Sequence, residues 1–357
     1  MEKITKHILV LICCFIMTGC MPKSIIDEVH LIQAAVFDVH KKDKVQVTFV
    51  CPIQEKGNKV QVFHGSGKTI KAIKTKASME SGQPFGSGQM RVALFTTELA
   101  KKGLSSTFDT IIRDVTIGNL LYVGLLEGNG KELLSGKYTT SDNVAIYIKK
   151  MLEHNMKTGS LPTDNLHLQA YRYYRDGQDP YMPMLKKKKD KIQITGVALF
   201  KQDQYVGKVK ANDLFVFKGL LEKHELDSRD FKTKSGYVMI NDIRSKPSYY
   251  VDIQNGKPSF LIKVKMDARL LEISKQVNLE QKKNVQKINE SVEKQLEKEA
   301  TTLIKKFQSL RVDPLGLGAK YRQNYRPFKL KEWEKIYKDV PIKVDYTVNI
   351  TNSGVIE

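Results

Sequence analysis

A long stretch of helical periodicity limits what this chain of 357 residues can fold into. Between positions 285 and 310, apolar residues recur at spacings of three and four, and the positions between them are mostly Glu, Lys, Gln and Asn. This pattern predicts one amphipathic helix from about Ile273 to Leu310, which Asp313-Pro314 ends because proline cannot continue a helix. We expect the apolar stripe to pack on the chain's own sheet, with an intermolecular coiled coil as the alternative.

Shorter apolar runs outside this helix predict strands and further helices. Alternating or continuous apolar residues at 45–50, 192–200 and 342–350 are typical of strands, as is the polar and aromatic pattern at 167–174, whereas 104–113 has helical spacing. These signals follow one another without a regular βαβ period. The predicted fold class is therefore α+β and multi-domain, with mixed or antiparallel sheets and a long amphipathic helix in the C-terminal domain.

Four consecutive lysines interrupt the apolar pattern and indicate a domain boundary near residue 190. Like charges repel, so Lys186, Lys187, Lys188 and Lys189 are expected to form a solvated turn or linker. The predicted organisation is a signal peptide at 1–19, an N-terminal α+β domain at 20–190, a middle domain at 191–258, and a C-terminal domain at 259–357 with the long helix and the final strand.

The first twenty residues indicate export. A weakly basic start precedes an unbroken apolar run at 8–17, which is too short to span a bilayer, and Thr18-Gly19-Cys20 follows. This order fits a bacterial lipobox, in which small residues admit the peptidase and the Cys20 thiol receives a diacylglyceryl group. Because two acyl chains anchor a protein stably, we expect a mature chain that begins at Cys20 and stays on the outer face of the membrane. An ordinary signal peptide with an incidental cysteine is the alternative.

The charge balance suggests an anionic partner. The chain has 59 Lys+Arg against 39 Asp+Glu, which gives a net charge of +20. The excess is spread over both halves without a basic recognition helix or an aromatic RNA platform, and export argues against nucleic acid as a partner. Two explanations remain: an anionic membrane surface, near which each basic residue contributes about 1 kcal/mol, or a basic exterior with no specific partner. The run Lys186 to Lys189 is the candidate membrane-surface contact.

The sequence offers no catalytic or metal-binding pattern. The glycine-rich segment 64–69 lacks the first glycine of a P-loop because position 62 is Val. The histidines have no metal-ligand spacing, and no Gly-x-Ser-x-Gly elbow is present, so an envelope hydrolase finds no support. Cys51 lies in an apolar run and is expected to be a buried small hydrophobe. We therefore expect no catalytic residues, no metal and no cofactor.

The segment after the long helix resembles the Ger(x)C spore germination lipoproteins. The motif Asp313-Pro314-Leu315-Gly316-Leu317-Gly318, followed by Tyr321-Arg322, Tyr325 and Trp333, is its most specific part, and Asp179-Pro180 resembles the segment before residue 190. The likeness covers nearly the whole mature chain. One departure is Met21-Pro22, where many members have Trp-Asp directly after the lipidated cysteine.

This resemblance implies a non-enzymatic C subunit of a nutrient germinant receptor. Such subunits are held by lipid at the outer face of the spore inner membrane, without a cofactor. They work with a polytopic A subunit and a transporter-like B subunit. The alternative function is a lipid-anchored solute-binding protein of a transporter, which would need a two-lobed α/β pattern around a ligand cleft.

Two roles are open for the C-terminal motif. If it defines the fold, its Asp-Pro pair stops the helix, its glycines permit a tight reversal, and its aromatic residues anchor the turn to a core. If it docks the partner subunits, Arg322 and Tyr325 are the exposed candidates. The candidate residues are Asp313, Pro314, Gly316, Gly318, Tyr321, Arg322, Tyr325 and Trp333.

Overall fold

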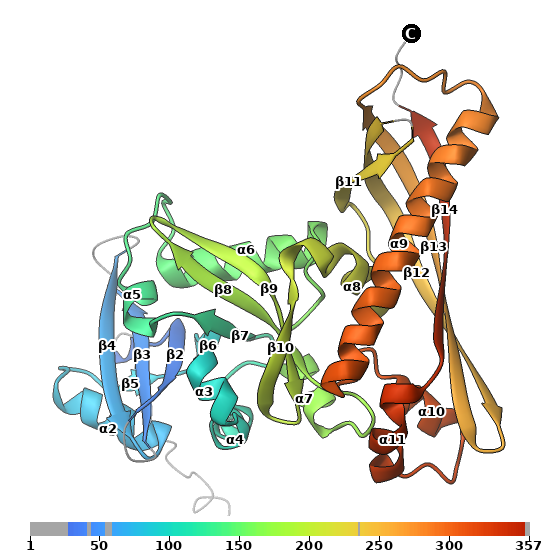
Figure 1. Ribbon diagram of the computed structural model, residues 1–357. Coiled ribbons are helices and arrows are strands. Elements are labelled where there is room, and N and C mark those ends of the chain that lie inside the picture. The colour runs from blue at the N-terminus through green and yellow to red at the C-terminus, as the bar shows by residue number, and fades with distance from the viewer. Residues whose placement is uncertain (1–27, 41–43, 54–58, 235, 354–357) are drawn as a thin grey trace, which may run out of the picture.

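The computed structural model describes residues 28–40, 44–53, 59–234 and 236–353 (Figure 1). Two large sheets organise this part of the chain, one of eight strands in the N-terminal half and one of four strands in the C-terminal half. In Figure 1 the C-terminal sheet stands as a tall layer beside the N-terminal part, with one long helix lying along it. The predicted multi-domain α+β class is confirmed, and the predicted lipidation site Cys20 lies outside the described residues.

The eight-stranded sheet is mixed. Its order is β10-β9-β8-β7-β6-β2-β3-β4. The central neighbours β2, β6, β7 and β8 run parallel, and the strands at both ends pair antiparallel. A short parallel pair, β1 with β5, is separate from it. The strands are β1 (His30–Leu31), β2 (Ala34–Val39), β3 (Val45–Pro52), β4 (Val60–Gly67), β5 (Phe85–Gly86), β6 (Val92–Thr96), β7 (Tyr122–Glu127), β8 (Tyr181–Lys188), β9 (Lys191–Lys201) and β10 (Gln204–Lys210).

Helices cover both faces of this sheet. Ala35 and Phe37 share one core with α2, α3 and α4, whereas Ala34 and Val36 share the other with α5 and α6. Neighbouring residues alternate between the two cores because side chains in a strand have a period of two. The helices are α2 (Ile70–Met79), α3 (Thr97–Lys102), α4 (Ser105–Arg113), α5 (Gly130–Leu134), α6 (Val144–Thr158), α7 (Leu166–Tyr174), the short η3 (Ala211–Asp213) and α8 (Leu214–Leu221).

The four-stranded sheet has the order β11-β12-β13-β14. β12 and β13 form a long antiparallel hairpin, and β14 adds to β13 in parallel. The elements of this part are β11 (Ser228–Thr233), β12 (Gly236–Gln254), β13 (Lys257–Ile273), α9 (Lys282–Leu310), α10 (Leu317–Asn324), α11 (Leu330–Ile336), η4 (Tyr337–Asp339) and β14 (Ile342–Ser353).

The long helix α9 packs on its own sheet, as predicted. Its apolar stripe, including Val292 and Leu296, is buried in one core with β13 and with part of the N-terminal sheet. Two glutamates of α9 also reach the free edge of the sheet: Glu293 accepts the N–H of Val348 over 2.8 Å, and Glu297 accepts that of Tyr346 over 3.1 Å. These bonds satisfy backbone groups that would otherwise pair with another strand.

Two element predictions are wrong. Residues 167–174 form helix α7 rather than a strand, because Asn165 caps its first turn and Leu166, Gln169 and Arg172 are buried at helical spacing. The long helix begins at Lys282 rather than near Ile273, which lies opposite Val238 at the end of β13. In both cases a short segment fits a helix and a strand equally well, and contacts with distant parts of the chain decide which of the two forms.

The lysine run belongs to a strand. Lys186, Lys187 and Lys188 continue β8, and Lys189 (φ 55°) makes the turn into β9. The predicted boundary near residue 190 therefore falls on a turn between two neighbours of the eight-stranded sheet. The boundary predicted between 258 and 259 falls just after the turn that joins β12 to β13. The division into domains stays a prediction.

Candidate functional site at the junction of the two sheets

The C-terminal motif begins where α9 ends. Arg311 takes the left-handed conformation (φ 55°) after the last turn, and the buried Asp313 follows. The Asp313 carboxylate accepts the N–H of Leu317 over 3.0 Å and that of Gly318 over 2.7 Å. These donors are free at the start of α10, and a negative group there is favourable for the helix. Asp313 thus caps the helix that follows it.

Two glycines of the motif are required by geometry. Gly316 has φ +68°, a conformation that side chains rarely adopt, and a Cβ there would lie 3.1 Å from Gln178. A Cβ on Gly318 would overlap the indole nitrogen of Trp333. The first glycine therefore permits the reversal into α10, and the second lets the tryptophan ring lie directly against the helix backbone.

The aromatic residues of the motif form one cluster. Tyr321 is 5% exposed, stacks on Tyr325 with ring centroids 5.2 Å apart, and lies 5.9 Å from the Trp333 ring. Its hydroxyl donates to the carbonyl of Gly256 over 2.6 Å, at the turn between β12 and β13. Trp333 also packs against Phe260 of β13 at 6.0 Å. The cluster fixes α10 and α11 on the lower end of the C-terminal sheet.

A second Asp-Pro pair, from the N-terminal half, meets the motif here. The N–H of Asp179 donates to the carbonyl of Asp313 over 2.9 Å, and the N–H of Asp313 donates to Asp179 Oδ2 over 2.7 Å. One residue earlier, Gln178 donates to the carbonyl of Pro314 over 3.3 Å. Gly177 (φ +79°) accepts the N–H of Ala319 over 2.9 Å. The segment between α7 and β8 is thus bonded to the C-terminal motif and to the start of α10 by both main-chain and side-chain groups.

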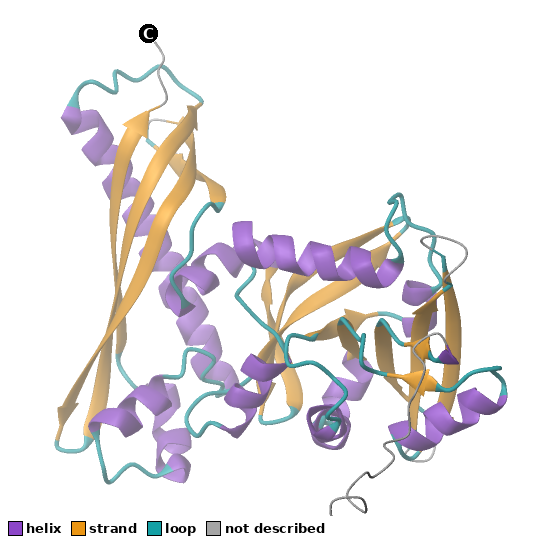
Figure 2. Ribbon diagram, turned by 180° about the vertical axis from the view of Figure 1, so that it is seen from behind, coloured by secondary structure: helices purple, strands orange, loops and turns teal. Residues whose placement is uncertain are grey.

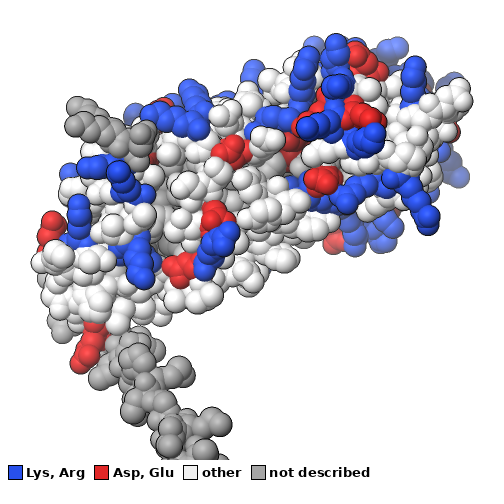
Figure 3. All heavy atoms as spheres, turned by 90° about the horizontal axis from the view of Figure 1, so that it is seen from below, with Lys and Arg blue, Asp and Glu red and all other residues white. Residues whose placement is uncertain are grey.

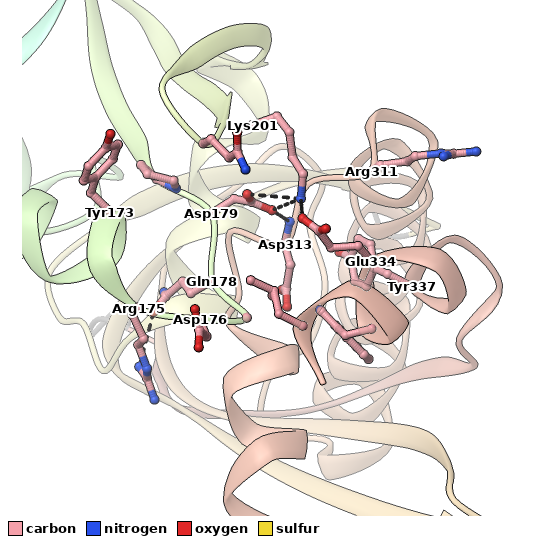
Figure 4. A pocket seen from close by; sticks show the side chains of 15 residues that line it. Tyr173, Arg175, Asp176, Gln178, Asp179, Lys201, Arg311, Asp313, Glu334 and Tyr337 are labelled. Atoms are coloured by element: carbon pink, nitrogen blue, oxygen red, sulfur yellow. Dashed lines mark hydrogen bonds and ion pairs between the residues drawn. The ribbon is translucent and has the colours of Figure 1, made fainter. Parts of the chain in front are cut away.

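A pocket of about 220 Å³ opens between these two segments (Figure 4). Lys201, at the end of β9, lies 3.5 Å from Asp179 and 2.9 Å from Glu334 of α11. Figure 4 shows these three charged groups pointing toward one another beside Asp313. These three charges are therefore paired across the junction, and the pair of Lys201 with Glu334 joins β9 to α11.

Burial governs the protonation of the carboxyl groups at the junction. It raises the pKa of Asp313 to about 7, while the N–H groups of Gly318 and Leu317 act in the opposite direction. Burial also raises the pKa of Asp179, against the attraction of Lys201. The pKa of Tyr337, beside both carboxyl groups, is raised by burial as well. The junction therefore binds protons more tightly than the same groups in water.

The predicted site residues separate into buried and exposed groups. Asp313, Tyr321 and Trp333 are buried, and Tyr325 is half-buried against Tyr321. Arg322 points away from them and makes a solvent-exposed ion pair with Asp176 over 3.0 Å. Of the two residues expected to be exposed in a docking role, Arg322 is exposed, whereas Tyr325, just past the end of α10, is half-buried by its stacking on Tyr321.

The other residues singled out from the sequence lie outside the junction. In the lysine run, Lys186, Lys188 and Lys189 are exposed and Lys187 is half-buried. Cys51 is fully buried and unpaired, as predicted, and burial raises the pKa of its thiol to about 12. Figure 3 shows Lys and Arg side chains over both halves of the lower surface, with acidic groups among them.

Sequence reasoning missed several members of the junction. Gln178 and Glu334 carry no motif that marks them, and the sequence assigns no role at this site to Lys201 and Tyr337, although they lie in segments that resemble the family. The one available signal was the recurrence of Asp-Pro at 179 and 313, whose pairing a single sequence does not specify. Within the described ranges no group of His, Cys, Asp and Glu side chains could hold a metal ion, and no helix there is long and apolar enough to cross a membrane.

Comparison with known proteins gives the same class for both halves. Residues 22–187 match the spore germination protein N-terminal domain, and residues 195–354 match the spore germination B3/GerAC-like C-terminal domain. Spore germination protein GerQC of Bacillus cereus is 32% identical over 357 residues, covering 99% of each chain. The putative spore germination protein YfkR of Bacillus subtilis strain 168 is 21% identical over 385 residues, covering 99% of this chain and 98% of that protein.

A solved structure agrees on the fold. The crystal structure of the GerBC protein superposes with a TM-score of 0.61 at 18% identity, covering 89% of this chain and 97% of the other. The chain is thus a spore germination protein by sequence along nearly its whole length. It belongs to the Ger(x)C family.

Proposed function

We propose that this chain is a lipid-anchored, non-enzymatic subunit of a spore germinant receptor. It acts in nutrient-triggered germination by assembling with a polytopic A subunit and a transporter-like B subunit at the outer face of the spore inner membrane. Cys20 carries the diacylglyceryl anchor. Membership of the Ger(x)C family along both halves of the chain supports this function.

Family membership is the observation that carries the proposal, and the reciprocal bonds between Asp179 and Asp313 bear on the role of the C-terminal motif within it. The residues most typical of the family are used in internal contacts: Asp313 caps α10, Trp333 packs on Gly318, and Lys201 joins the two carboxylates beside it. A motif used in this way holds two folded parts in a fixed orientation. We infer that it defines the fold, and that the protein works as a rigid scaffold between membrane partners.

The anchor is tested with two cysteine variants of the full chain. Cys20→Ala removes the lipidated thiol, so the protein should leave the membrane fraction of spores and nutrient-triggered germination should be impaired. Cys51→Ala is the matched control, because Cys51 is buried in the N-terminal core and its loss should leave both readouts near those of the wild type. Full membrane retention of Cys20→Ala would contradict the proposed anchor.

A further inference from the structure

Among the residues that the structure describes, no helix covers one face of the C-terminal sheet. α9 covers the face with Ile262, Val264 and Met266, which are buried, whereas the residues between them on β13 point the other way. Figure 2 shows this second face from behind, with the strands toward the viewer and α9 beyond them. We call it the open face. Its central residues are Arg244, Lys246, Ser248 and Tyr250 of β12, Leu261, Lys263, Lys265 and Asp267 of β13, and Lys343, Asp345 and Thr347 of β14.

The centre of the open face carries like charges opposite one another. Lys246 of β12 lies directly opposite Lys265 of β13 in the antiparallel register. Lys263 is two residues before Lys265 on β13. All three side chains are exposed, and within the described residues none has a carboxylate within 4.0 Å. Like charges directly opposite in a sheet are destabilising. The fold thus keeps a repulsive pair where a neutral pair would be more stable.

Neighbouring acidic groups do not relieve this repulsion. Asp345 faces Lys263 in the register of β13 and β14, but its carboxylate pairs with Lys343 over 2.9 Å. Asp267 faces Arg244, and its carboxylate accepts a hydrogen bond from Asn349 over 3.3 Å. The three central lysines are therefore available to an anionic group from another molecule.

An aromatic and apolar groove continues the open face toward its lower end. Tyr250 is 54% exposed, and Lys263 lies over its ring at 5.5 Å. Tyr250, Leu261 and Lys343 line an open groove of about 610 Å³ at the three strands β12, β13 and β14. Exposed tyrosine beside apolar groups is a composition typical of protein interfaces.

The size and shape of the face favour a protein over a bilayer. β13 has 17 residues. At a rise of about 3.3 Å per residue and about 4.8 Å between strands, three strands of that length cover roughly 800 Å². A standard protein interface buries about 800 Å² on each partner. A bilayer surface is flat and would meet a twisted sheet along only part of its length, and lipid headgroups do not fill an apolar groove.

We propose that the open face binds an acidic segment of a protein partner, with Lys246, Lys263 and Lys265 facing its carboxylates and Tyr250 and Leu261 packing in the groove against its apolar residues. This proposal rests on the proposed function, since it names the surface by which the anchored subunit joins its membrane partners. It also explains why the repulsive lysine pair is retained: the charge is compensated only in the complex.

Site-specific photocrosslinking in intact spores tests the surface. A photoreactive amino acid at Ser248, which lies between Lys246 and Tyr250 on the open face, should give one protein adduct whose crosslinked peptide is rich in Asp and Glu. The same amino acid at Thr301, exposed on the outer side of α9, is the matched control and should not give that adduct. Adducts with phospholipid, with a second copy of this chain or with a peptide that lacks acidic residues, or the absence of any adduct, would overturn the proposal.

Charge reversal separates binding from folding. Lys265→Glu creates an opposite-charge pair with Lys246, so the Tm should rise while the Ser248 adduct falls severalfold. The triple variant Lys246→Glu/Lys263→Glu/Lys265→Glu should abolish the adduct. Lys305→Glu, on the exposed side of α9, makes the same charge change and should leave the adduct unchanged. An adduct that persists in the triple variant would show that the lysines do not bind the partner.

Failure of the open-face proposal can be distinguished from failure of the proposed function. Loss of the anchor in Cys20→Ala moves the whole protein out of the membrane fraction. Charge reversal should leave the protein in that fraction at wild-type abundance and remove only the adduct. If Cys20→Ala behaves as expected and the Ser248 adduct does not depend on charge, the subunit assignment stands and the open face is not its contact.

Discussion

Asp179 and Asp313 hold each other through two main-chain N–H groups, across a sequence separation of 134 residues: Asp179 donates to a carbonyl over 2.9 Å and Asp313 donates to a carboxylate over 2.7 Å. Both are followed by proline, which has no N–H of its own and favours extended backbone in the residue before it. Proline therefore favours an extended backbone at both aspartates, which meet where the N-terminal and C-terminal sheets come together. This contact acts together with the core that α9 shares with the N-terminal sheet to set the relative position of the two sheets.

Replacing Asp179 should loosen the junction. Asp179→Ala removes the acceptor of the buried Asp313 N–H and one of the two partners of Lys201. Leaving a buried donor unpaired costs about 1–3 kcal/mol, so the free energy of unfolding should fall by that amount in a denaturant titration. Asp176→Ala is the control, because the Asp176 carboxylate makes only an exposed pair with Arg322, a class worth about 0–1 kcal/mol. Equal losses in both variants would contradict the structural role given to Asp179.

The stability of the protein should depend on the protonation of Asp313. Its pKa in the folded protein, about 7, lies above the value of an unfolded Asp, because the carboxyl group is buried. Between these two values the folded state binds more protons than the unfolded state, so the contribution of Asp313 to stability is full below about pH 4 and is lost as the pH rises toward 7, by at most about 1.4 kcal/mol per pH unit. The raised pKa values of Asp179 and Asp164 act in the same direction.

Asp313→Asn checks this dependence. The amide oxygen can still accept a backbone N–H, but the side chain no longer titrates. Denaturant titrations across this pH range should therefore give a shallower slope for the variant than for the wild type, with Asp164 and Asp179 contributing what remains. The prediction is wrong if the two slopes coincide.

A contrast between two motif residues tests whether the motif defines the fold or docks a partner. A Cβ on Gly318 would overlap Trp333, so Gly318→Ala should lower the free energy of unfolding by about 1–3 kcal/mol through overpacking. Arg322→Ala removes an exposed pair and should cost less than about 1 kcal/mol. If the motif acts through the fold, germination should decline in proportion to the loss of stability and Arg322→Ala spores should germinate normally.

Two further observations sharpen that contrast. Gly118→Ala, at a glycine with open space around it, controls for the change of residue type and should be close to neutral. A stable Arg322→Ala protein that reaches the membrane but fails to support germination would instead identify Arg322 as a docking residue.

The parts of this fold that depend on short-range periodicity could be predicted from the sequence. The stripe of α9, from Val292 to Phe307, repeats often enough to exclude a strand. The segment 167–174 is too short to exclude a strand, because eight residues with alternating polar and aromatic side chains fit either the helical or the strand period. Which of its faces the N-terminal core buries decides that it is a helix. The end of β13 at Ile273 was likewise set by its partner Val238.

The candidate site was predictable in its C-terminal half only. Proline after Asp313 and the two following glycines mark a reversal by local chemistry alone, and Trp333 is expected to be buried because of its size. The partners Asp179 and Lys201 come from a distant segment, and their roles depend on how the two sheets are placed. Long-range pairing of this kind leaves no periodic pattern in one sequence.

The lysine run at the β8–β9 turn should contribute to membrane affinity if it lies near anionic lipid. Each basic residue near such a surface adds about 1 kcal/mol, and salt screens this attraction. Replacing Lys186 to Lys189 with alanine, in a Cys20→Ala background so that acyl chains do not mask the effect, should reduce flotation with phosphatidylglycerol vesicles at low salt and make no difference at high salt.

A second set of four lysines supplies the control for that flotation experiment. Lys287, Lys294, Lys298 and Lys305 are exposed along one side of α9, so replacing them with alanine removes the same charge from a different surface. A general attraction of a basic protein to anionic lipid would make the two quadruple variants lose flotation equally. A membrane contact made by the lysine run itself should reduce flotation only in the variant at the β8–β9 turn. If the Lys186 to Lys189 variant floats at wild-type levels at every salt concentration, the run is not a membrane contact. The net charge of the chain would then act at protein surfaces such as the open face.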